Sequence, residues 1–476
     1  MGLAAYGEYD GLGLAELVAR GEVSAAELVE AAIERIERHN GALNAVVHKA
    51  YDEARATAKS DLPAGPFRGV PMLVKDLDVA VAGWPRSCGS RFARDLMDEA
   101  DSSLIARYRG SGAILVGKTN TPEYGITGTT ESAHLGPCRN PWSLGHSAGG
   151  SSGGSASAVA AAIVPLAHGT DGLGSIRIPA ACCGLVGLKP TRDRNPNFPD
   201  GFDYADGFVS NHVLTRTVRD SAAMLDVTGR PEAASPFAAP PKAGPYLDEV
   251  GRSPGRLKIA WSAETPTGRA INSEVEAALH RTADLLGRLD HDVEERGLGI
   301  DYLALYRAIF PVTAANFAAD MKRLVARVGR EPGSDELEPL TWASLKGGRK
   351  VTGEEVMWCL QELGRLNCKT LALFETFDVF LTPVMGTPPP AIGYIDPVTL
   401  APGEAMRRQG EVFPYTPPFN ASGQPSISLP LAWSDGGLPI GMMFTARYAD
   451  EATLFRLAGQ LEKEAPWKDR RPGIWN

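Results

Sequence analysis

Apolar and polar residues follow a helical period near the start of the chain. Ser24-Ala-Ala-Glu27 has the form of a capping box, in which each polar side chain bonds to the backbone of the other residue. Asn40-Gly41 is typical of a helix end, so we predict a helix from Ser24 to this pair. The apolar face of this helix consists of Leu28, Val29, Ala32, Ile33 and Ile36.

Short apolar runs then alternate with helical patterns. Strands are predicted over 45–48, 72–74 and 113–116, and a helix over 102–110. This alternation is typical of a buried, mostly parallel sheet that helices cover on its faces. The sequence therefore favours the α/β fold class.

The second half of the chain is mainly helical between two sets of strands. A strand is predicted over 258–261, helical patterns fill 271–376, and a last helix begins near Glu451. Late strands are predicted over 379–382, 426–431 and 440–446. Because they follow the helical stretch, both ends of the chain should complete one sheet. We predict a single domain over 1–476, with a catalytic core at about 65–230 and the helical insertion at about 271–376.

Composition and charge exclude several function classes. The 476 residues carry a net charge of −9 without a Lys/Arg cluster, so no nucleic-acid partner is expected. The most apolar stretch, 156–167, is too short to span a bilayer, and the first residues lack the basic start of a secretory signal. Six cysteines without a CxxC pair are typical of free thiols in a reducing compartment. We therefore expect a cytoplasmic protein with no membrane partner.

Two further patterns favour structural interpretations. Residues 112–119 match the G-x-x-x-x-G-K-[ST] sequence pattern of a nucleotide-binding loop. However, 113–116 form an apolar run that predicts a strand. The histidines lack the spacing of a metal-binding motif and are interpreted as core or solvated side chains. No metal and no cofactor is expected.

A glycine-rich segment indicates a serine hydrolase without the usual histidine. Gly149-Gly150-Ser151-Ser152-Gly153 matches the G-x-S-x-G turn, which requires an acid and then a histidine downstream. The last histidine of the chain, His291, has no recognisable triad partner nearby. Another base is needed, and the sequence points to a lysine.

Three separated motifs contain candidate catalytic residues. Lys75, within 69–76, lies at the C-terminal end of an apolar strand, and alone it would be a charge at the edge of a sheet. Ser151, within 149–156, could alone belong to a turn or a helix cap, and Ser175, within 169–180, to a phosphate-binding loop.

Together these motifs resemble the amidase signature family. The resemblance runs from about residue 11 to the C-terminus and includes 117–123, 139–142, 184–191, 381–383 and Phe419-Asn420. It implies an α/β/α sandwich around a large mixed, mostly parallel central sheet.

The resemblance also implies a Ser-cisSer-Lys triad. Ser175 would be the nucleophile, Ser151 the bridging serine after a cis peptide bond from Gly150, and Lys75 the base. A serine hydroxyl is a poor nucleophile until a base removes its proton. Lysine can be that base only when neutral, so burial and nearby cations are expected to lower its pKa. Ser151 could relay the proton, because a hydroxyl donates and accepts at once.

The family resemblance assigns supporting roles to neighbouring groups. The oxyanion hole is expected from the backbone N–H groups of Gly172, Leu173, Gly174 and Ser175. Asp171 and Arg177 are expected to hold this loop by an ion pair. Gly150 and Ser152, on either side of Ser151, are the other supporting residues.

Two positions depart from the family pattern. Leu173 stands where members commonly have glycine, which disfavours a positive φ and places a branched side chain beside the reacting carbon. Backbone donation survives this change if φ stays negative. Asp193 replaces another usual glycine, and Asn195, Phe198, Phe202, Tyr204 and Phe208 of the following loop are expected to shape the pocket mouth.

The expected reaction is hydrolysis of a small-molecule amide through a serine acyl-enzyme, by a monomer or homodimer. The resemblance is strongest to members that hydrolyse cyclic nylon oligomers (6-aminohexanoate cyclic dimer) and urethanes, so carbamates are also candidate substrates. One alternative is the glutaminase subunit of a tRNA-dependent amidotransferase, which predicts partner chains and glutamine specificity. The other is a non-catalytic binding member of the family, for which Leu173 is the only support.

Overall fold

The computed structural model describes residues 3–196, 207–233, 235, 237–266 and 268–475. Its strands are β1 (Val46–Lys49), β2 (Pro71–Lys75), β3 (Ile114–Thr119), β4 (Glu131–Ser132), β5 (Gly136–Pro137), β6 (Arg139–Asn140), β7 (Ser143–Ser147), β8 (Leu166–Asp171), β9 (Val186–Lys189), β10 (Ser210–Thr215), β11 (Lys258–Trp261), β12 (Asp292–Glu295), β13 (Val379–Pro383), β14 (Ser426–Trp433) and β15 (Pro439–Ala446). Its helices are α1 (Leu3–Tyr6), α2 (Gly11–Ala19), α3 (Ala25–Leu43), α4 (Tyr51–Ala58), α5 (Ser103–Gly110), α6 (Gly153–Ala160), α7 (Arg177–Cys183), α8 (Val218–Thr228), α9 (Tyr246–Glu249), α10 (Ser273–Arg288), α11 (Tyr302–Val328), α12 (Pro339–Gly348), α13 (Gly353–Ala372), α14 (Pro402–Val412), α15 (Pro417–Ala421) and α16 (Glu451–Glu464).

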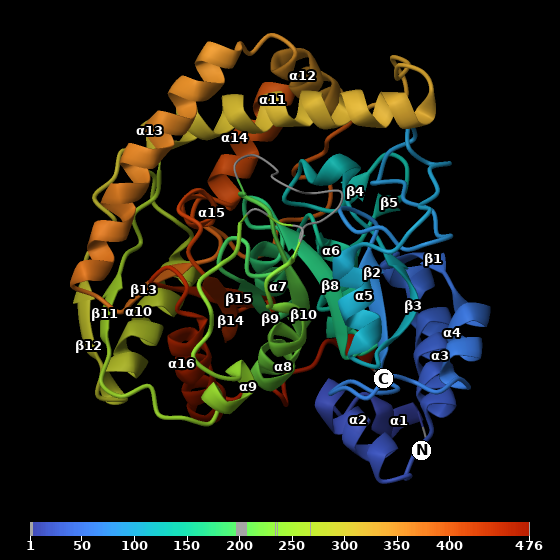
Figure 1. Cartoon of the computed structure of the whole chain (residues 1–476). Coiled ribbons are helices and arrows are strands. Elements are labelled where there is room, and N and C mark those ends of the chain that lie inside the picture. Colours follow the sequence, from blue (N-terminus) through green and yellow to red (C-terminus); the bar gives the residue numbers. More distant parts are fainter. Residues whose placement is uncertain (1–2, 197–206, 234, 236, 267, 476) are drawn as a thin grey trace.

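Eleven strands of the described chain form one mixed sheet, in the order β1-β3-β2-β8-β10-β9-β14-β15-β13-β11-β12 (Figure 1). Parallel pairs form two blocks, β3-β2-β8 and β13-β11-β12, and antiparallel pairs make up the remainder. The mixed sheet completed by late strands is confirmed. More of its strand pairs are antiparallel than the alternation of strands and helices predicts. This is because β14 and β15 form a hairpin and β10 runs antiparallel to both β8 and β9.

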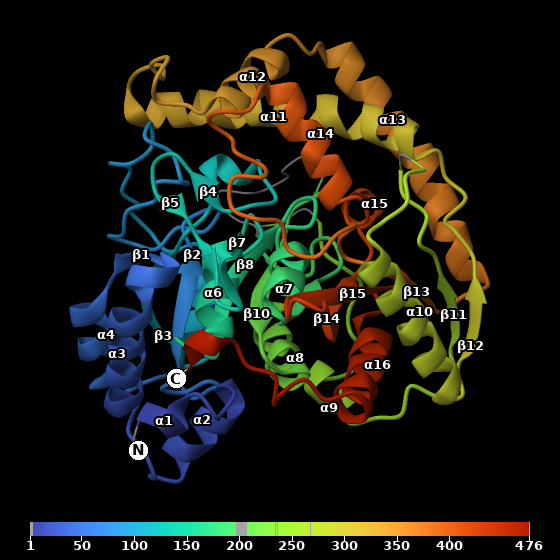
Figure 2. The same ribbon diagram turned by 180° about the vertical axis from the view of Figure 1, so that it is seen from behind.

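Both faces of this sheet are buried. In β13, Leu381 belongs to an apolar cluster with helices α8, α10 and α16, whereas its neighbour Phe380 belongs to a separate cluster with α6 and α7. Phe444 and Met443 of β15 divide between the two clusters in the same way. Since successive strand residues point to opposite faces, helices cover both sides. The α/β/α sandwich is confirmed, and Figures 1 and 2 show it from opposite sides.

The N-terminal helix α3 begins as predicted and ends later. Ser24 and Glu27 form the capping box. The helix continues to Leu43, because Asn44 adopts the left-handed conformation that terminates it, with φ 51°. Asn40 lies inside the last turns instead, and its side-chain oxygen accepts from the N–H groups of Ala45 and Val46 at 2.8 and 2.7 Å. The predicted stop at Asn40-Gly41 is therefore wrong, and Asn40 positions the entry into β1.

The predicted helical insertion contains one strand. β12 pairs in parallel with β11 at the edge of the sheet. Its sequence, Asp292-Val-Glu-Glu295, is mostly exposed and lacks the apolar alternation that reveals a half-buried strand. The segment predicted to be mainly helical, 271–376, therefore also contains a strand that the sequence pattern did not indicate.

Helices α11, α12 and α13 form an arm above the sheet (Figure 1). Arg327 of α11 lies 3.5 Å from buried Asp98, which also pairs with Arg86 at 2.8 Å. A third apolar cluster joins this arm to loops of the core and consists of Phe92, Phe317, Met321, Leu337 and Leu345. The arm is therefore packed on the side of the core from which the loop after β2 emerges.

The two ends of the described chain lie on the same side of the molecule (Figures 1 and 2). Arg35 of α3 donates to the carbonyl of Trp475 at 2.6 Å, which fastens the C-terminal segment to an N-terminal helix. Over the part of the chain that the structure describes, no helix combines the length and apolar character that a membrane crossing requires.

The contact of α6 with the end of β3 generates a stability prediction. A Cβ on Gly154 would lie 2.3 Å from the backbone nitrogen of Asn120, so Gly154→Ala should lower the free energy of unfolding by about 3 kcal/mol. Gly364, in the exposed middle of α13, has no atom within 4 Å of such a Cβ. Gly364→Ala should instead raise stability by about 0.5–1 kcal/mol. Urea unfolding followed by circular dichroism measures both, and equal midpoints for the two variants would contradict the contact.

Candidate active site

The candidate site begins at Lys75, the last residue of β2. The side chain is fully buried, and its Nζ donates to Ser151 Oγ at 2.6 Å and to Thr170 Oγ1 at 2.7 Å. Ser151 precedes α6, and Thr170 lies in β8, which pairs in parallel with β2. Adjacent parallel strands end at the same edge of the sheet, and this geometry brings the two predicted residues Lys75 and Ser151 together with Thr170.

The pKa of Lys75 is lowered from 10.5 to about 8 because burial removes water from its ammonium form. The expected burial is confirmed. The expected nearby cations are not what acts on it: the groups that affect it are Asp78, Asp171 and the thiol of Cys88, and all three raise the pKa. A lysine in this setting is neutral in a large fraction of molecules at mildly alkaline pH.

The peptide bond between Gly150 and Ser151 is cis, as predicted. Gly150 lies against the neighbouring chain so closely that a Cβ would stand 2.7 Å from backbone atoms of Gly128 and Thr129. Only glycine fits there, which gives Gly150 its supporting role. The carbonyl of Ser151 accepts from Thr121 Oγ1 at 3.0 Å, so the backbone is held on both sides of the bond.

Ser152 connects this loop to the other two segments. Its hydroxyl accepts from the N–H of Thr170 at 3.2 Å and donates to the Thr170 carbonyl at 3.3 Å. Its backbone N–H donates to the carbonyl of Ser175 at 3.2 Å. Ser152 thus fixes the loop of Ser151 beside the segment of Ser175.

Asp171 and Arg177 form the predicted ion pair, with both side chains wholly buried. Arg177 Nε and Nη2 each donate to Asp171 at 2.9 Å. Burial opposes ionisation of Asp171, but Arg177 outweighs it and holds the pKa of that carboxyl well below its ordinary value. Because Arg177 is enclosed, it stabilises the loop and is not presented to a substrate.

The loop between these two charges contains the predicted oxyanion-hole residues. Gly174, with φ 129°, donates its N–H to Asp171 Oδ1 at 2.7 Å. The carbonyl of Leu173 accepts from Thr416 Oγ1 at 2.6 Å. Leu173 is not among the described residues with positive φ. The N–H groups of Leu173 and Ser175 have no acceptor among the described residues, so they remain open to an external oxygen atom.

Ser175 stands half-buried at the end of this loop. Its hydroxyl has no hydrogen-bond partner in the described part of the chain, and its segment meets Ser151 through the Ser152 N–H. Ser175 is thus joined to the residue that follows Ser151, and its half-exposed hydroxyl is available to attack a substrate carbonyl.

Two side chains of the site had no role assigned from the sequence. Thr170 shares Lys75 with Ser151, and only its position before Asp171 in a strand could have indicated this. Asn420 lies in a motif that carries the family resemblance, and its amide donates to the Asp171 carbonyl and carboxylate at 3.0 and 2.9 Å. Its contact comes from α15, about 250 residues away, a separation that no local pattern reports.

The loop expected at the pocket mouth is only partly described. Phe198, Phe202 and Tyr204 lie outside the described residues. Asn195 and Phe208 are buried, and the Phe208 carbonyl accepts from the Asn420 amide at 3.1 Å. Phe208 therefore contacts the residue that holds Asp171, whereas the Asn195 amide donates to the carbonyl of Asn211 at 2.5 Å.

The histidine nearest Lys75 is a core side chain, as predicted. His168 accepts from the Lys75 N–H at 3.4 Å, and its other ring nitrogen meets Asn211 at 3.1 Å. Burial lowers its pKa to about 3, so the imidazole is neutral. Over the described ranges, no group of three or more His, Cys, Asp or Glu side chains is arranged to hold a metal ion.

Comparison with known proteins identifies the family of this chain. The Amidase family model matches residues 27–455. The 6-aminohexanoate-cyclic-dimer hydrolase of Paenarthrobacter ureafaciens is 38% identical, over 98% of this chain and 97% of its own length. A solved structure of 6-aminohexanoate cyclic dimer hydrolase complexed with substrate has a TM-score of 0.93 at 36% identity and covers 100% of both chains.

A second solved structure extends the comparison. A bacterial aryl acylamidase of the amidase signature family has a TM-score of 0.87 at 30% identity, over 98% of both chains. The family model spans most of the sequence, and these relatives match this chain over nearly its whole length. The protein belongs to the amidase signature family of amide hydrolases.

Proposed function

We propose that this amide hydrolase works through a Ser-cisSer-Lys triad, with Ser175 as nucleophile, Ser151 as proton relay and Lys75 as base. The observation that carries the proposal is the 2.6 Å hydrogen bond from Lys75 Nζ to Ser151 Oγ inside a fully buried site. A neutral amine there can accept a proton from Ser151 while Ser151 accepts one from Ser175.

The reaction then proceeds by acyl transfer to water. Ser175 Oγ attacks the amide carbonyl, and its proton moves through Ser151 to Lys75. The proton returns by the same route to the leaving amine when the tetrahedral intermediate collapses to an acyl-enzyme. Water attacks this ester with the same groups acting again, and the acid is released. In each half of the reaction Lys75 takes up one proton and returns it, so the enzyme ends in its starting protonation state.

The oxyanion of the intermediate would be stabilised by backbone N–H groups of the Asp171–Arg177 loop. Leu173 and Ser175 supply the open donors. Donors fixed in place before the reaction lower the barrier, typically by about 3 kcal/mol each. The buried ion pair joins the two ends of this loop.

The substrate we propose is a small amide with an apolar acyl group, and carbamates are included because they pass through a similar tetrahedral intermediate. A Cβ on Gly125 would lie 3.1 Å from Ser151 Oγ, so the loop 124–126 adjoins the reaction centre. Its half-exposed Tyr124 and Ile126 pack against the apolar cluster of the helical arm. The 6-aminohexanoate cyclic dimer, named for two of the relatives described above, is a candidate that suits such a wall.

Replacement of the proposed nucleophile tests the triad. Ser175→Ala should lower kcat by at least about 10³-fold on every substrate that the wild type cleaves, because no acyl-enzyme can form. Initial rates are measured on a primary amide, an anilide, an aryl carbamate, a cyclic dimeric amide and glutamine, with Ser434→Ala, a surface turn residue, as control.

Full activity of Ser175→Ala would overturn the triad. Activity on glutamine alone would favour an amidotransferase subunit, and no turnover of any substrate by the wild type would favour a binding role. Cleavage of amides without the aryl carbamate would remove carbamates from the proposed substrate class.

The pKa of Lys75 sets the expected pH dependence. Only neutral lysine accepts a proton, so kcat/KM should rise tenfold per pH unit below about 8 and become constant above it. The measurement is kcat/KM from pH 5.5 to 10, with circular dichroism at each pH to confirm that the fold is intact. A profile that is flat across pH 7–9, or that falls there, would contradict a lysine base.

A further inference from the structure

Helix α6 begins two residues after Ser151, and the N–H groups of its first turn need acceptors. A serine directly before a helix usually supplies one of them through its side chain. Here the N-cap residue, Ser152, makes no capping bond, because its hydroxyl bonds to the backbone of Thr170. The hydroxyl of Ser151 is also occupied, since it accepts from Lys75. The cap of α6 must therefore come from another part of the chain.

Thr130 supplies this cap. Its hydroxyl accepts from the N–H of Gly153, the first residue of α6, at 3.2 Å and donates to the carbonyl of Gly149 at 2.8 Å. These two backbone groups lie at the ends of the turn 149–153, and within the described chain neither has another hydrogen-bond partner. A single hydroxyl thus closes the turn that presents Ser151.

The turn and the segment of Thr130 are in close contact. A Cβ on Gly153 would lie 2.4 Å from Thr130 Oγ1. A Cβ on Gly150 would lie 2.7 Å from backbone atoms of Thr129. Both glycines are therefore required for the two segments to lie side by side. Thr130 is wholly buried, so bulk solvent does not reach its two hydrogen bonds.

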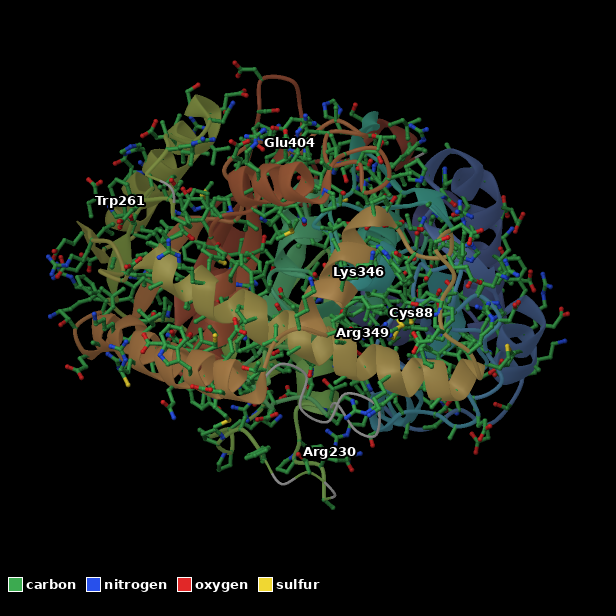
Figure 3. The ribbon with its side chains drawn as sticks, turned by 90° about the horizontal axis from the view of Figure 1, so that it is seen from above. Cys88, Arg230, Trp261, Lys346, Arg349 and Glu404 are labelled. Atoms are coloured by element: carbon green, nitrogen blue, oxygen red, sulfur yellow. The ribbon has the colours of Figure 1, made fainter. Side chains whose placement is uncertain are left out.

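The segment that carries Thr130 is fastened to the helical arm. Glu338, at the start of α12, donates its backbone N–H to the Glu123 carboxylate at 2.8 Å, and its own carboxylate accepts from the N–H of Ala133 at 2.7 Å. Both glutamates are buried. Figure 3 looks down on this arm, with Lys346 of α12 above the core. Because the segment is held both before and after Thr130, it provides a fixed base for the cap.

Without the Thr130 hydroxyl, a serine of the site would compete for the free backbone group. Ser151 lies two residues before Gly153, a spacing at which a serine hydroxyl bonds to a backbone N–H in short turns. A buried N–H without an acceptor is costly, which favours such a bond. A Ser151 hydroxyl drawn to Gly153 would leave Lys75. The cap from Thr130 removes this competition.

We propose that Thr130 is a positioning residue for the reaction, which caps α6 and so keeps the hydroxyl of Ser151 on Lys75. The inference rests on the proposed function, because it concerns the proton relay of that mechanism. The hydroxyl of Thr130 bonds to the backbone of the turn, so it takes no proton from the reaction and acts only through Ser151.

The test removes this hydroxyl while the shape of the side chain is nearly retained. Thr130→Val loses both hydrogen bonds, and misplacement of a reacting group by about 1 Å can cost about 10²-fold in rate. We expect kcat to fall about 10²-fold, with KM nearly unchanged because Ser151 acts in the chemical step. Thr130→Ser keeps the hydroxyl and should restore most of this loss.

Thr282→Val is the matched control. Thr282 is also buried, and its hydroxyl donates to the carbonyl of Ala278 at 2.8 Å within α10. This variant loses the same kind of hydroxyl from another helix, so kcat and KM should stay at their wild-type values. Urea unfolding of both variants shows whether a fall in kcat exceeds what lost stability explains.

Combination with Ser151→Ala separates positioning from a general structural role. If Thr130 acts through Ser151, Thr130→Val should not lower the residual rate of Ser151→Ala any further. Equal losses in the presence and in the absence of the Ser151 hydroxyl would overturn the proposal.

Crystal structures of the wild type and of Thr130→Val measure the placement without turnover. The distance from Lys75 Nζ to Ser151 Oγ, 2.6 Å here, should exceed hydrogen-bonding length in the variant. Unchanged kcat with this contact intact would overturn the inference. Unchanged kcat with the contact broken would support the placement by Thr130 and overturn the proton relay instead. If Thr130→Val does not fold, Thr130→Ala is measured in the same way, and the same two outcomes decide.

Discussion

The buried ion pair of Asp171 and Arg177 is the interaction on which the site depends. It closes the loop that carries Ser175, because one partner ends β8 and the other begins α7. A buried pair is stable only when its remaining donors and acceptors are satisfied. Here Gly174, Asn420 and the Thr416 carbonyl satisfy them. Loss of one partner of such a pair typically costs about 3–5 kcal/mol, so the geometry of the loop and the stability of the fold are coupled.

Burial has opposite consequences for the two positive charges of the site. Arg177 contacts a carboxylate at 2.9 Å, and it serves as a fixed brace. Lys75 donates to two uncharged hydroxyl oxygens, and burial lowers its pKa to about 8. The same sheet interior thus provides a permanent cation for structure and, in the proposed mechanism, a reversible proton acceptor for chemistry. The two roles differ because Arg177 contacts a charged carboxylate, whereas Lys75 contacts uncharged hydroxyl groups.

The sequence was informative where the chemistry depends on residue types at fixed local spacing. Apolar periodicity predicts the late strands and a sheet covered by helices. The family resemblance, which the three motifs carry, implies Lys75 beside Ser151, the cis bond after Gly150 and the ion pair. The sequence was not informative where the decisive contact crosses the chain. Asn420 contacts Asp171 from α15, and no local sequence pattern near either residue indicates this contact. β12 was missed because an exposed edge strand needs no apolar pattern, and the end of α3 because Asn44, not Asn40-Gly41, takes the left-handed conformation.

Leu173 shows how a departure from the family pattern can leave the backbone function intact. The residue is half-buried and its side chain packs against the main apolar cluster, which gives the branched side chain a place of its own. Its carbonyl is held by Thr416, and the Gly174 N–H is held by Asp171. Both anchors hold the peptide between Leu173 and Gly174, which directly follows the Leu173 N–H. That N–H has no acceptor among the described residues. A hole built from two backbone donors is sufficient in other serine hydrolases. In the proposed mechanism, donation from the Leu173 N–H therefore does not need the glycine that the family commonly has at this position.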